Sequence, residues 1–141
     1  MRYLILALGL AMTTATGFAE EQADIFKPVT PQMELDEFAW KNRLVVVFAN
    51  SKEDVRFQTQ IEFLKTDLAA LAEREIIVLT DPDPANDSLL RKKFRPRSFT
   101  LLIIGKDGQV KLRKPFPWDI RALSRAIDKM PMRRQEIKSK K

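Results

Sequence analysis

The stretch FTLLIIGKDGQVKLR, residues 99–113, holds an apolar segment and a segment of alternating apolar and cationic residues, with Gly105-Lys106-Asp107-Gly108 between them. An Asp-Gly pair between two such segments favours a tight turn, so the stretch predicts a β-hairpin. The segment from Phe99 to Ile104 is apolar without alternation, which is typical of a strand covered on both faces. The segment from Val110 to Arg113 is expected to return beside it, antiparallel.

Two further apolar runs precede the hairpin and predict buried strands, LVVVF at 44–48 and IIVL at 76–79. The segment between them predicts one helix of about five turns, because its apolar residues recur every three or four positions. These residues are Phe57, Ile61, Leu64, Leu68 and Leu71. Ser51 is expected to cap this helix, with Asp54 in the reciprocal position of a capping box.

Two more helices complete the order of elements. Residues 86–94 predict a short helix that Pro96 ends, and residues 118–130 predict a last helix that Pro131 ends. Since crossovers join the first three strands, these strands are predicted to be parallel. The order predicts the α/β class with a thioredoxin-like arrangement, a mixed four-stranded sheet with helices on both faces and a C-terminal β-hairpin plus helix.

The N-terminus has the parts of a secretory signal peptide. Arg2 supplies the positive charge, residues 3–12 form the apolar run, and Gly17-Phe18-Ala19 supplies the small residues that signal peptidase accepts. The predicted location is therefore periplasmic or secreted, with no transmembrane span after cleavage, because the apolar run is too short. The predicted divisions are a signal peptide at 1–19, a flexible leader at 20–34, a thioredoxin-like domain at 35–131 and a basic C-terminal tail at 132–141.

The composition excludes several kinds of chemistry. The chain has no cysteine and no histidine, and cleavage after Ala19 would also remove its one tyrosine, Tyr3, and lower the formal net charge from +6 to +5. No thiolate nucleophile, redox-active cysteine pair or cysteine zinc site is possible, and no histidine can act as a general base. We predict no catalytic residue, no metal site and no cofactor.

Four segments carry a resemblance to a known family: FAWKNR at 38–43, LAER at 71–74, GKDGQVKLR at 105–113 and IDKMPMRRQE at 127–136. The chain resembles the DUF4174 family, a thioredoxin-like domain of unknown function found in exported bacterial proteins, with related domains in animal extracellular matrix proteins. The resemblance implies the thioredoxin-like fold. No activity comes with it.

The chain also departs from redox thioredoxins. Their paired cysteines lie where the first strand meets the long helix, and here that stretch is Asn50 to Arg56, which cannot form a disulfide. Their cis-proline lies just before the third of these strands, where this chain has Ser98-Phe99-Thr100, and Pro96 comes too early. The resemblance therefore implies the fold without oxidoreductase activity.

Two polar segments are candidates for an anion-binding or a catalytic site, and a structural role is favoured for each. The start of the long helix, at 51–56, could bind an anion, but Glu53 and Asp54 already place negative charge there, so capping is the better interpretation. Asp81-Pro82-Asp83 follows a strand, as in phosphatases with an aspartyl nucleophile and magnesium. The domain is too short for the larger sheet of those enzymes, so a surface turn is favoured.

A cluster of cations is the candidate binding site. We expect Arg91, Arg95, Arg97, Lys111 and Arg113 to form one cationic surface, because the first three precede the third strand and the others lie on one face of its antiparallel neighbour. A nucleic-acid partner is disfavoured, since no aromatic residue interleaves the basic tail. A solvated edge that discourages pairing between sheets stays open as an alternative.

Together these observations predict an exported thioredoxin-like module without redox activity. Its predicted role is to bind a protein or an anionic component of the cell envelope. The alternative is an enzyme without thiol chemistry that uses carboxylates and arginines at the edge of the sheet. An enzyme would need a concave site where a few polar groups converge, whereas a binding module needs only an exposed patch.

Overall fold

The computed structural model describes residues 24–141, so the predicted signal peptide at 1–19 lies outside the described residues. One mixed sheet has the strand order β1-β3-β2-β4-β5. The strands are β1 Phe26–Pro28, β2 Arg43–Phe48, β3 Ile76–Asp81, β4 Thr100–Ile104 and β5 Val110–Lys114. The helices are η1 Leu35–Glu37, α2 Val55–Lys65, α3 Leu68–Glu73, η2 Pro84–Asn86, α4 Leu89–Phe94, α5 Ile120–Asp128 and α6 Pro131–Ser139. The predicted α/β class is confirmed, with β1 as a strand that the sequence did not predict.

The direction of β4 differs from the prediction. β1, β3 and β2 are parallel, but β4 is antiparallel to β2, and β5 is antiparallel to β4. The prediction of three parallel strands joined by crossovers is therefore wrong for β4. β3 ends at Asp81, which pairs with Phe48 at the end of β2. The chain therefore re-enters the sheet at the end where it left, and Thr100 pairs with Phe48.

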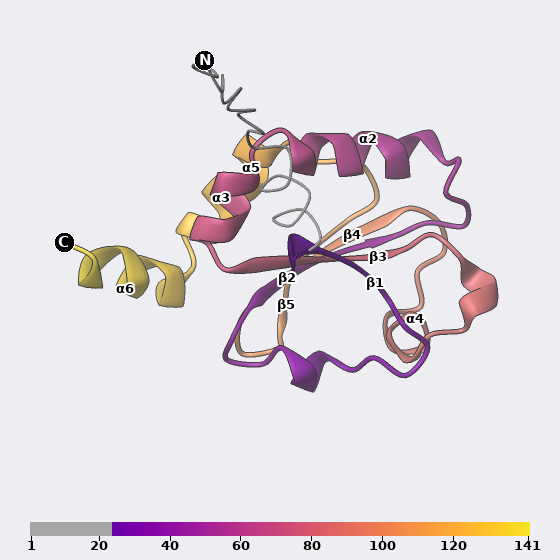
Figure 1. Cartoon of the computed structure of the whole chain (residues 1–141), viewed down its shortest axis with the longest axis horizontal. Helices are drawn as coiled ribbons and strands as arrows, with labels where there is room; N and C mark the ends of the chain where they lie inside the picture. The colour runs from indigo at the N-terminus through magenta and orange to yellow at the C-terminus, as the bar shows by residue number, and fades with distance from the viewer. Residues whose placement is uncertain (1–23) are drawn as a thin grey trace, which may run out of the picture.

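Helices cover both faces of the sheet (Figure 1), with α2, α3 and α5 on one side and α4 on the other. β2 is buried along its whole length and contributes to both layers. Val45 and Val47 pack in the cluster that includes Leu64 of α2. Leu44 and Val46 pack in the cluster that includes the α4 side chains. This two-sided burial explains why the sequence of the strand is a continuous apolar run.

The segment expected to be a flexible leader is part of the sheet. β1 pairs with β3, and both Ile25 and Val29 are buried. The Asn86 side chain donates a hydrogen bond to the carbonyl of Val29, and the backbone N–H of Leu89 donates to the carbonyl of Pro31. The prediction of a mobile leader is therefore wrong for residues 25–31. Its polar and proline-rich composition concealed the two buried side chains.

The predicted five-turn helix is two helices. Asp67 interrupts it and caps α3 by accepting a hydrogen bond from the backbone N–H of Ala70. Asp54, and not Ser51, caps α2 and accepts a hydrogen bond from the backbone N–H of Arg56.

Nowhere in residues 24–141 does a helix run long enough and apolar enough to cross a bilayer.

The segment expected to be a basic tail forms α6. Pro131 ends no helix, because α5 already stops at Asp128, and it stands in the first turn of α6. A proline is well accommodated there, since the N–H that it lacks would have no helical partner. Arg133 of α6 is buried. The prediction of a basic tail is therefore wrong, and Arg133 is buried because it forms ion pairs with Glu73, Asp128 and Glu136.

Candidate functional site

Arg91 lies inside the molecule. Its Nη2 donates hydrogen bonds to the carbonyl of Ala49 at 2.9 Å, to the carbonyl of Asp81 at 2.8 Å and to the Asp81 carboxylate at 3.2 Å. Ser88 donates a second hydrogen bond to that carboxylate, at 2.7 Å. The guanidinium also stacks 5.4 Å from the centre of the Phe48 ring. Arg91 therefore joins α4 to the ends of β2 and β3 and adds little to the surface charge.

Arg113 brings β5 and the end of α4 together. Its Nη1 donates to the carbonyl of Phe94 at 2.9 Å and its Nη2 to the carbonyl of Arg95 at 3.5 Å. These carbonyls lie at the C-terminus of α4, where the helix dipole favours a cation. Arg95 ends that helix in a left-handed conformation with φ 48°. Two of the predicted site residues are thus brought side by side.

We call the resulting surface the basic corner and define it as Lys93, Arg95, Arg97 and Arg113. All four residues are exposed. The salt bridges within residues 24–141 leave each of them without a carboxylate partner, although the neighbouring Lys92 pairs with Asp87. The basic corner is therefore an uncompensated positive surface, which attracts anionic groups.

Lys111 does not join the basic corner. A bulge between β4 and β5 pairs Ile103 with Leu112 and Ile104 with Val110, so Lys111 falls in the irregular part of β5. Its ammonium binds the Asp107 carboxylate at 2.8 Å. The prediction assumed unbroken alternation along β5, and the bulge removes that alternation. Lys111 is thus neutralised at the hairpin turn.

The junction at 50–56 is polar and tied to the loop before β4. Asn50 donates a hydrogen bond to the carbonyl of Arg97 at 3.2 Å. Arg56 binds the Asp54 carboxylate at 2.9 Å and donates to the hydroxyl of Ser98 at 2.7 Å. The hydrogen bond from Arg56 lowers the pKa of Asp54. These contacts hold the stretch that replaces the cysteine pair of redox thioredoxins.

The Asp81-Pro82-Asp83 segment has no free carboxylate of the kind that a nucleophile needs. Asp81 is buried and bound to Ser88 and Arg91. Asp83 caps η2 by accepting a hydrogen bond from the backbone N–H of Ala85 at 3.0 Å. Both carboxylates therefore stabilise the turn between β3 and α4.

An ion network that the sequence did not predict holds α6 against the sheet. The Glu136 carboxylate accepts hydrogen bonds from Arg43 at 3.0 Å, from Lys106 at 2.7 Å and from Arg133 at 3.3 Å. The side chains of Arg43 and Arg133 are each only 2% exposed. Burial alone would raise the pKa of Glu136, but the hydrogen bonds from Arg43 and Lys106 outweigh it and lower the pKa to about 2. We call this set the α6 ion network; its other members are Glu73, Arg74, Glu75 and Asp128.

The four segments that carry the family resemblance meet in this network. Arg43 ends the first segment and Arg74 the second, Lys106 belongs to the third, and Asp128, Arg133 and Glu136 belong to the fourth. Each of the four segments contains charged residues although the segments lie far apart in the sequence, and this is the pattern from which the network could have been predicted. The network has a structural role, because its buried cations and its carboxylates neutralise one another and hold α6 in place.

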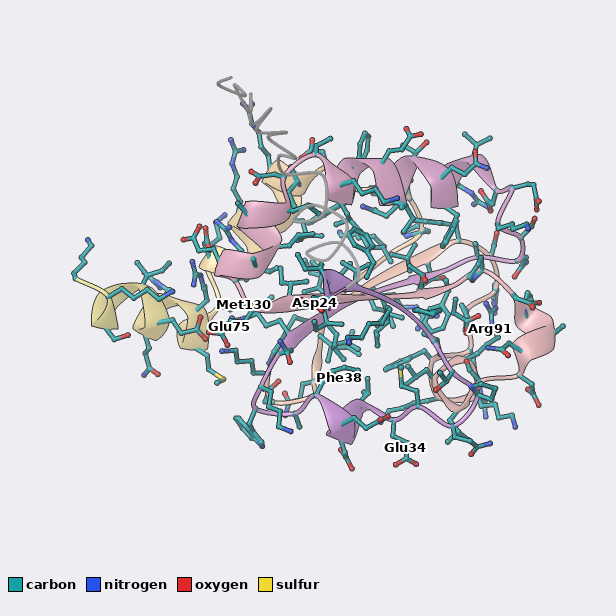
Figure 2. The ribbon with its side chains drawn as sticks, in the orientation of Figure 1. Asp24, Glu34, Phe38, Glu75, Arg91 and Met130 are labelled. Carbon is teal, nitrogen blue, oxygen red and sulfur yellow. The ribbon has the colours of Figure 1, made fainter. Side chains whose placement is uncertain are left out.

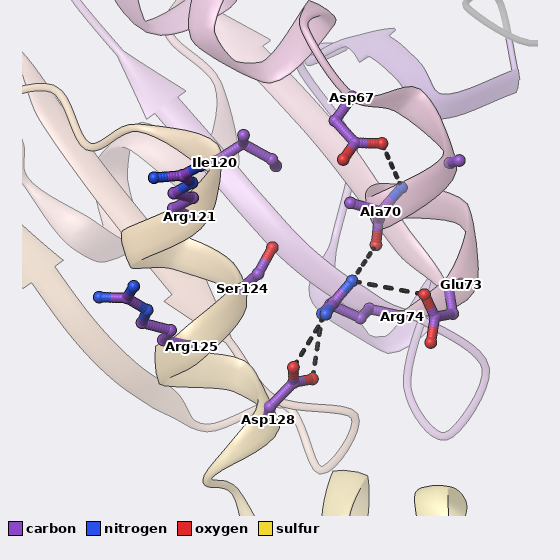
Figure 3. Close-up of a pocket in the computed structure, with 10 residues that line it drawn as sticks. Asp67, Ala70, Glu73, Arg74, Ile120, Arg121, Ser124, Arg125 and Asp128 are labelled. Atoms are coloured by element: carbon purple, nitrogen blue, oxygen red, sulfur yellow. Dashed lines mark hydrogen bonds and ion pairs between the residues drawn. The ribbon is translucent and has the colours of Figure 1, made fainter.

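A groove of about 500 Å³ lies between α3 and α5 (Figure 3). Arg74 of one wall binds Asp128 of the other at 2.8 Å. Arg121 and Arg125 extend from α5 away from α3 in this view. The two charged groups that face each other across the groove are therefore already paired. No nucleophile lies beside a general base among the residues that line it.

Comparisons with known proteins agree with this architecture. Residues 34–136 match the family described as Domain of unknown function (DUF4174). A similar curated protein is Coiled-coil domain-containing protein 80 of Danio rerio, with 29% identity over an alignment of 141 positions; the alignment covers 79% of this chain but only 16% of that protein.

Solved structures show the same fold. A mutant thioredoxin from Halobacterium salinarum NRC-1 superposes with a TM-score of 0.57 and 20% identity, over 74% of this chain and 89% of that one. The reduced 2-Cys peroxiredoxin of Plasmodium vivax gives a TM-score of 0.55 and 16% identity, over 74% and 85%. At these identities the likeness shows a thioredoxin-like fold and nothing about activity.

Proposed function

The chain belongs to the DUF4174 family and has a thioredoxin-like fold in a sequence without cysteine, and from this premise we propose that it is a non-redox binding module. We propose further that it is exported and that it binds an anionic partner, either an acidic protein surface or another anionic component of the envelope. The basic corner is the surface that makes this contact.

The observation that carries the proposal is the crowding of exposed cations, unpaired within residues 24–141, at the end of one short helix. Arg91, Lys111 and the cations of the α6 ion network are all bound to carboxylates. Lys93, Arg95 and Arg97 stand exposed at the end of α4 with no carboxylate partner among the salt bridges of residues 24–141. Like charges crowded in this way repel one another, and an anionic partner relieves that repulsion.

An enzymatic role receives less support from the same geometry. The carboxylate and arginine best placed at the carboxyl end of the parallel strands are Asp81 and Arg91, and they are bound to each other. A reaction would need one of them free to exchange a proton or to contact a substrate.

The test uses fluorescein-labelled poly-L-glutamate as an acidic probe. Wild type is expected to bind it at low salt and to lose affinity steeply as salt is added. Lys93→Glu/Arg97→Glu reverses two charges of the basic corner and leaves the Arg113 contacts in place. We expect this variant to bind the probe more weakly than wild type does, and the exposed cations on and after α6 account for the binding that remains.

The matched control is Arg121→Glu/Arg125→Glu, which changes the net charge equally on α5. The control is expected to bind the probe nearly as well as wild type. The proposal is wrong if both double variants lose affinity to the same extent, because the binding would then depend only on total charge. It is also wrong if wild type does not bind the probe at low salt.

A further inference from the structure

Trp40 is a large apolar side chain in an unusual position. It is 67% exposed, and its backbone is left-handed with φ 65°. Bulky aromatic residues rarely adopt this conformation. The backbone N–H of Trp40 donates to the carbonyl of Lys106 at 2.7 Å, which fixes the residue against the hairpin. The fold therefore holds an indole in solvent, in a backbone conformation that glycine would adopt more easily.

A second exposed apolar side chain lies at the same end of the molecule. Met132 of α6 is 37% exposed. It lines a small pocket of about 150 Å³ together with Lys106, Met130 and Pro131. Lys106 thus contacts Trp40 through its backbone and borders the pocket of Met132. Figure 2 shows Met130 and Glu75 near the start of α6, whereas Arg91 lies at the far end of the sheet.

The charges of α6 divide into an inner and an outer set. Arg133 and Glu136 face inward and are bound within the α6 ion network. The outer cations are exposed, and none has a carboxylate partner in the salt bridges of residues 24–141. They are Lys41 beside Trp40, and Arg134, Lys138, Lys140 and Lys141 on and after α6.

We propose that this end of the molecule docks on a bilayer that carries anionic headgroups. The docking surface consists of Trp40 and Met132 as apolar contacts and the outer cations as electrostatic contacts. Indole rings favour the boundary between headgroups and acyl chains, and each nearby lysine or arginine strengthens binding to an anionic membrane. An acidic protein would also satisfy the cations and could bury the indole, but a single exposed indole flanked by cations is the combination that anchors proteins at the membrane interface, and this favours the bilayer.

The docking surface is separate from the basic corner. α6 and α4 lie at opposite ends of the long axis of the molecule (Figure 1), so a bilayer and an anionic partner could be bound at once. The inference therefore does not depend on the proposed function, and either can fail without the other.

The test measures binding to vesicles of phosphatidylcholine alone and of phosphatidylcholine with phosphatidylglycerol, using protein purified as the cell processes it. Trp118→Phe makes Trp40 the only indole, because the chain has two tryptophans. We expect binding to the anionic vesicles only, with quenching of Trp40 fluorescence by brominated lipid. Arg134→Glu/Lys138→Glu is expected to weaken binding by about tenfold or more.

Two variants separate docking from stability and from total charge. Trp40→Gly removes the indole and suits the left-handed backbone, so its melting temperature should stay equal or rise while vesicle binding falls. Arg121→Glu/Arg125→Glu makes the same charge change away from the docking surface and should bind the vesicles as wild type does. The proposal is overturned if the anionic vesicles are not preferred, if Trp40 is not quenched, or if the charge-matched control loses as much binding as Arg134→Glu/Lys138→Glu.

Discussion

Asp81 and Arg91 form a buried ion pair that organises the carboxyl end of the sheet. The Asp81 side chain is 1% exposed and that of Arg91 is 12% exposed. Replacing Asp81 by Asn leaves the guanidinium buried without its counter-charge, at an expected cost of about 3–5 kcal/mol in the free energy of unfolding. Urea unfolding of Asp81→Asn measures this loss.

The control for this prediction is Asp87→Asn. Asp87 pairs with Lys92 on the surface, where the two side chains are 72% and 58% exposed, and asparagine tolerates its left-handed backbone. Its loss is expected to be about 1 kcal/mol or less. Equal losses for the two variants would show that the Asp81–Arg91 pair is no more important than a surface pair.

At the scale of residues, the sequence predicts only in part which cations lie together on the surface and which are bound to a buried carboxylate. Arg95 and Arg113 were predicted to lie together, and they do. The same basic stretch predicts that Arg91 joins them, but Arg91 contacts the Asp81 carboxylate, ten residues away, and the Ala49 carbonyl just after another strand. A local run of cations cannot show which member has a buried carboxylate within reach.

At the scale of elements, α6 depends on charge more than on apolar packing. The folded-state pKa of Glu136 is about 2, below the usual 4.5, so its stabilisation is fully present above pH 4.5 and is lost as the pH falls toward 2. The fall of the pKa from 4.5 to about 2 corresponds to a contribution on the order of 3 kcal/mol, and solvent screens it little because the Glu136 side chain is only 22% exposed. Glu136→Gln should therefore be less stable than wild type at pH 7 and should lose less on acidification to pH 3.

Urea unfolding at the two pH values checks this prediction. Glu62→Gln, on the exposed side of α2, is the control and should follow wild type at both. Should Glu136→Gln lose as much stability on acidification as wild type, Glu136 would not be the group that carries the acid sensitivity. Some sensitivity should remain in either case, since the pKa of Asp128 is also lowered by its arginine partners against the opposing effect of burial.

The helices on the sheet were easier to predict than the elements at its ends. Leu64 and Ile127 are fully buried, as their helical periodicity predicted. α6 was missed because a proline can either end a helix or begin one, and because the partners of Arg133 and Glu136 lie far away in sequence. Short-range periodicity detects a face that packs on a sheet, but it does not detect a helix held by distant ions.

At the scale of the whole molecule, the fold class and the C-terminal hairpin could be predicted, but the direction of β4 could not. A helix between two apolar strands predicts a crossover, and only the pairing of Phe48 with both Asp81 and Thr100 shows that the chain returns to the end of the sheet that it left. The cationic surface was likewise predicted as a single patch. The bulge between β4 and β5 and the burial of Arg91 reduce it to the basic corner.

Export is a prediction about the whole chain. We expect the protein of the envelope fraction to begin at Glu20, because Gly17 and Ala19 provide the small residues for cleavage. Mass spectrometry of the intact protein measures this directly. Ala19→Arg is the control and should leave the precursor uncut. An N-terminus at Met1 in the cytoplasmic fraction of wild type would contradict the prediction.

The α6 ion network has a consequence for the behaviour of the molecule on heating. The hydration of charged groups becomes less favourable as temperature rises, so burying Arg43, Arg133 and Glu136 is penalised less in warm water than in cold. Conformational entropy opposes the ordering of every element, α6 included, more strongly under the same conditions. The smaller cost of burying these ions offsets part of that loss on warming, and cooling is the direction in which the cost of burying them grows.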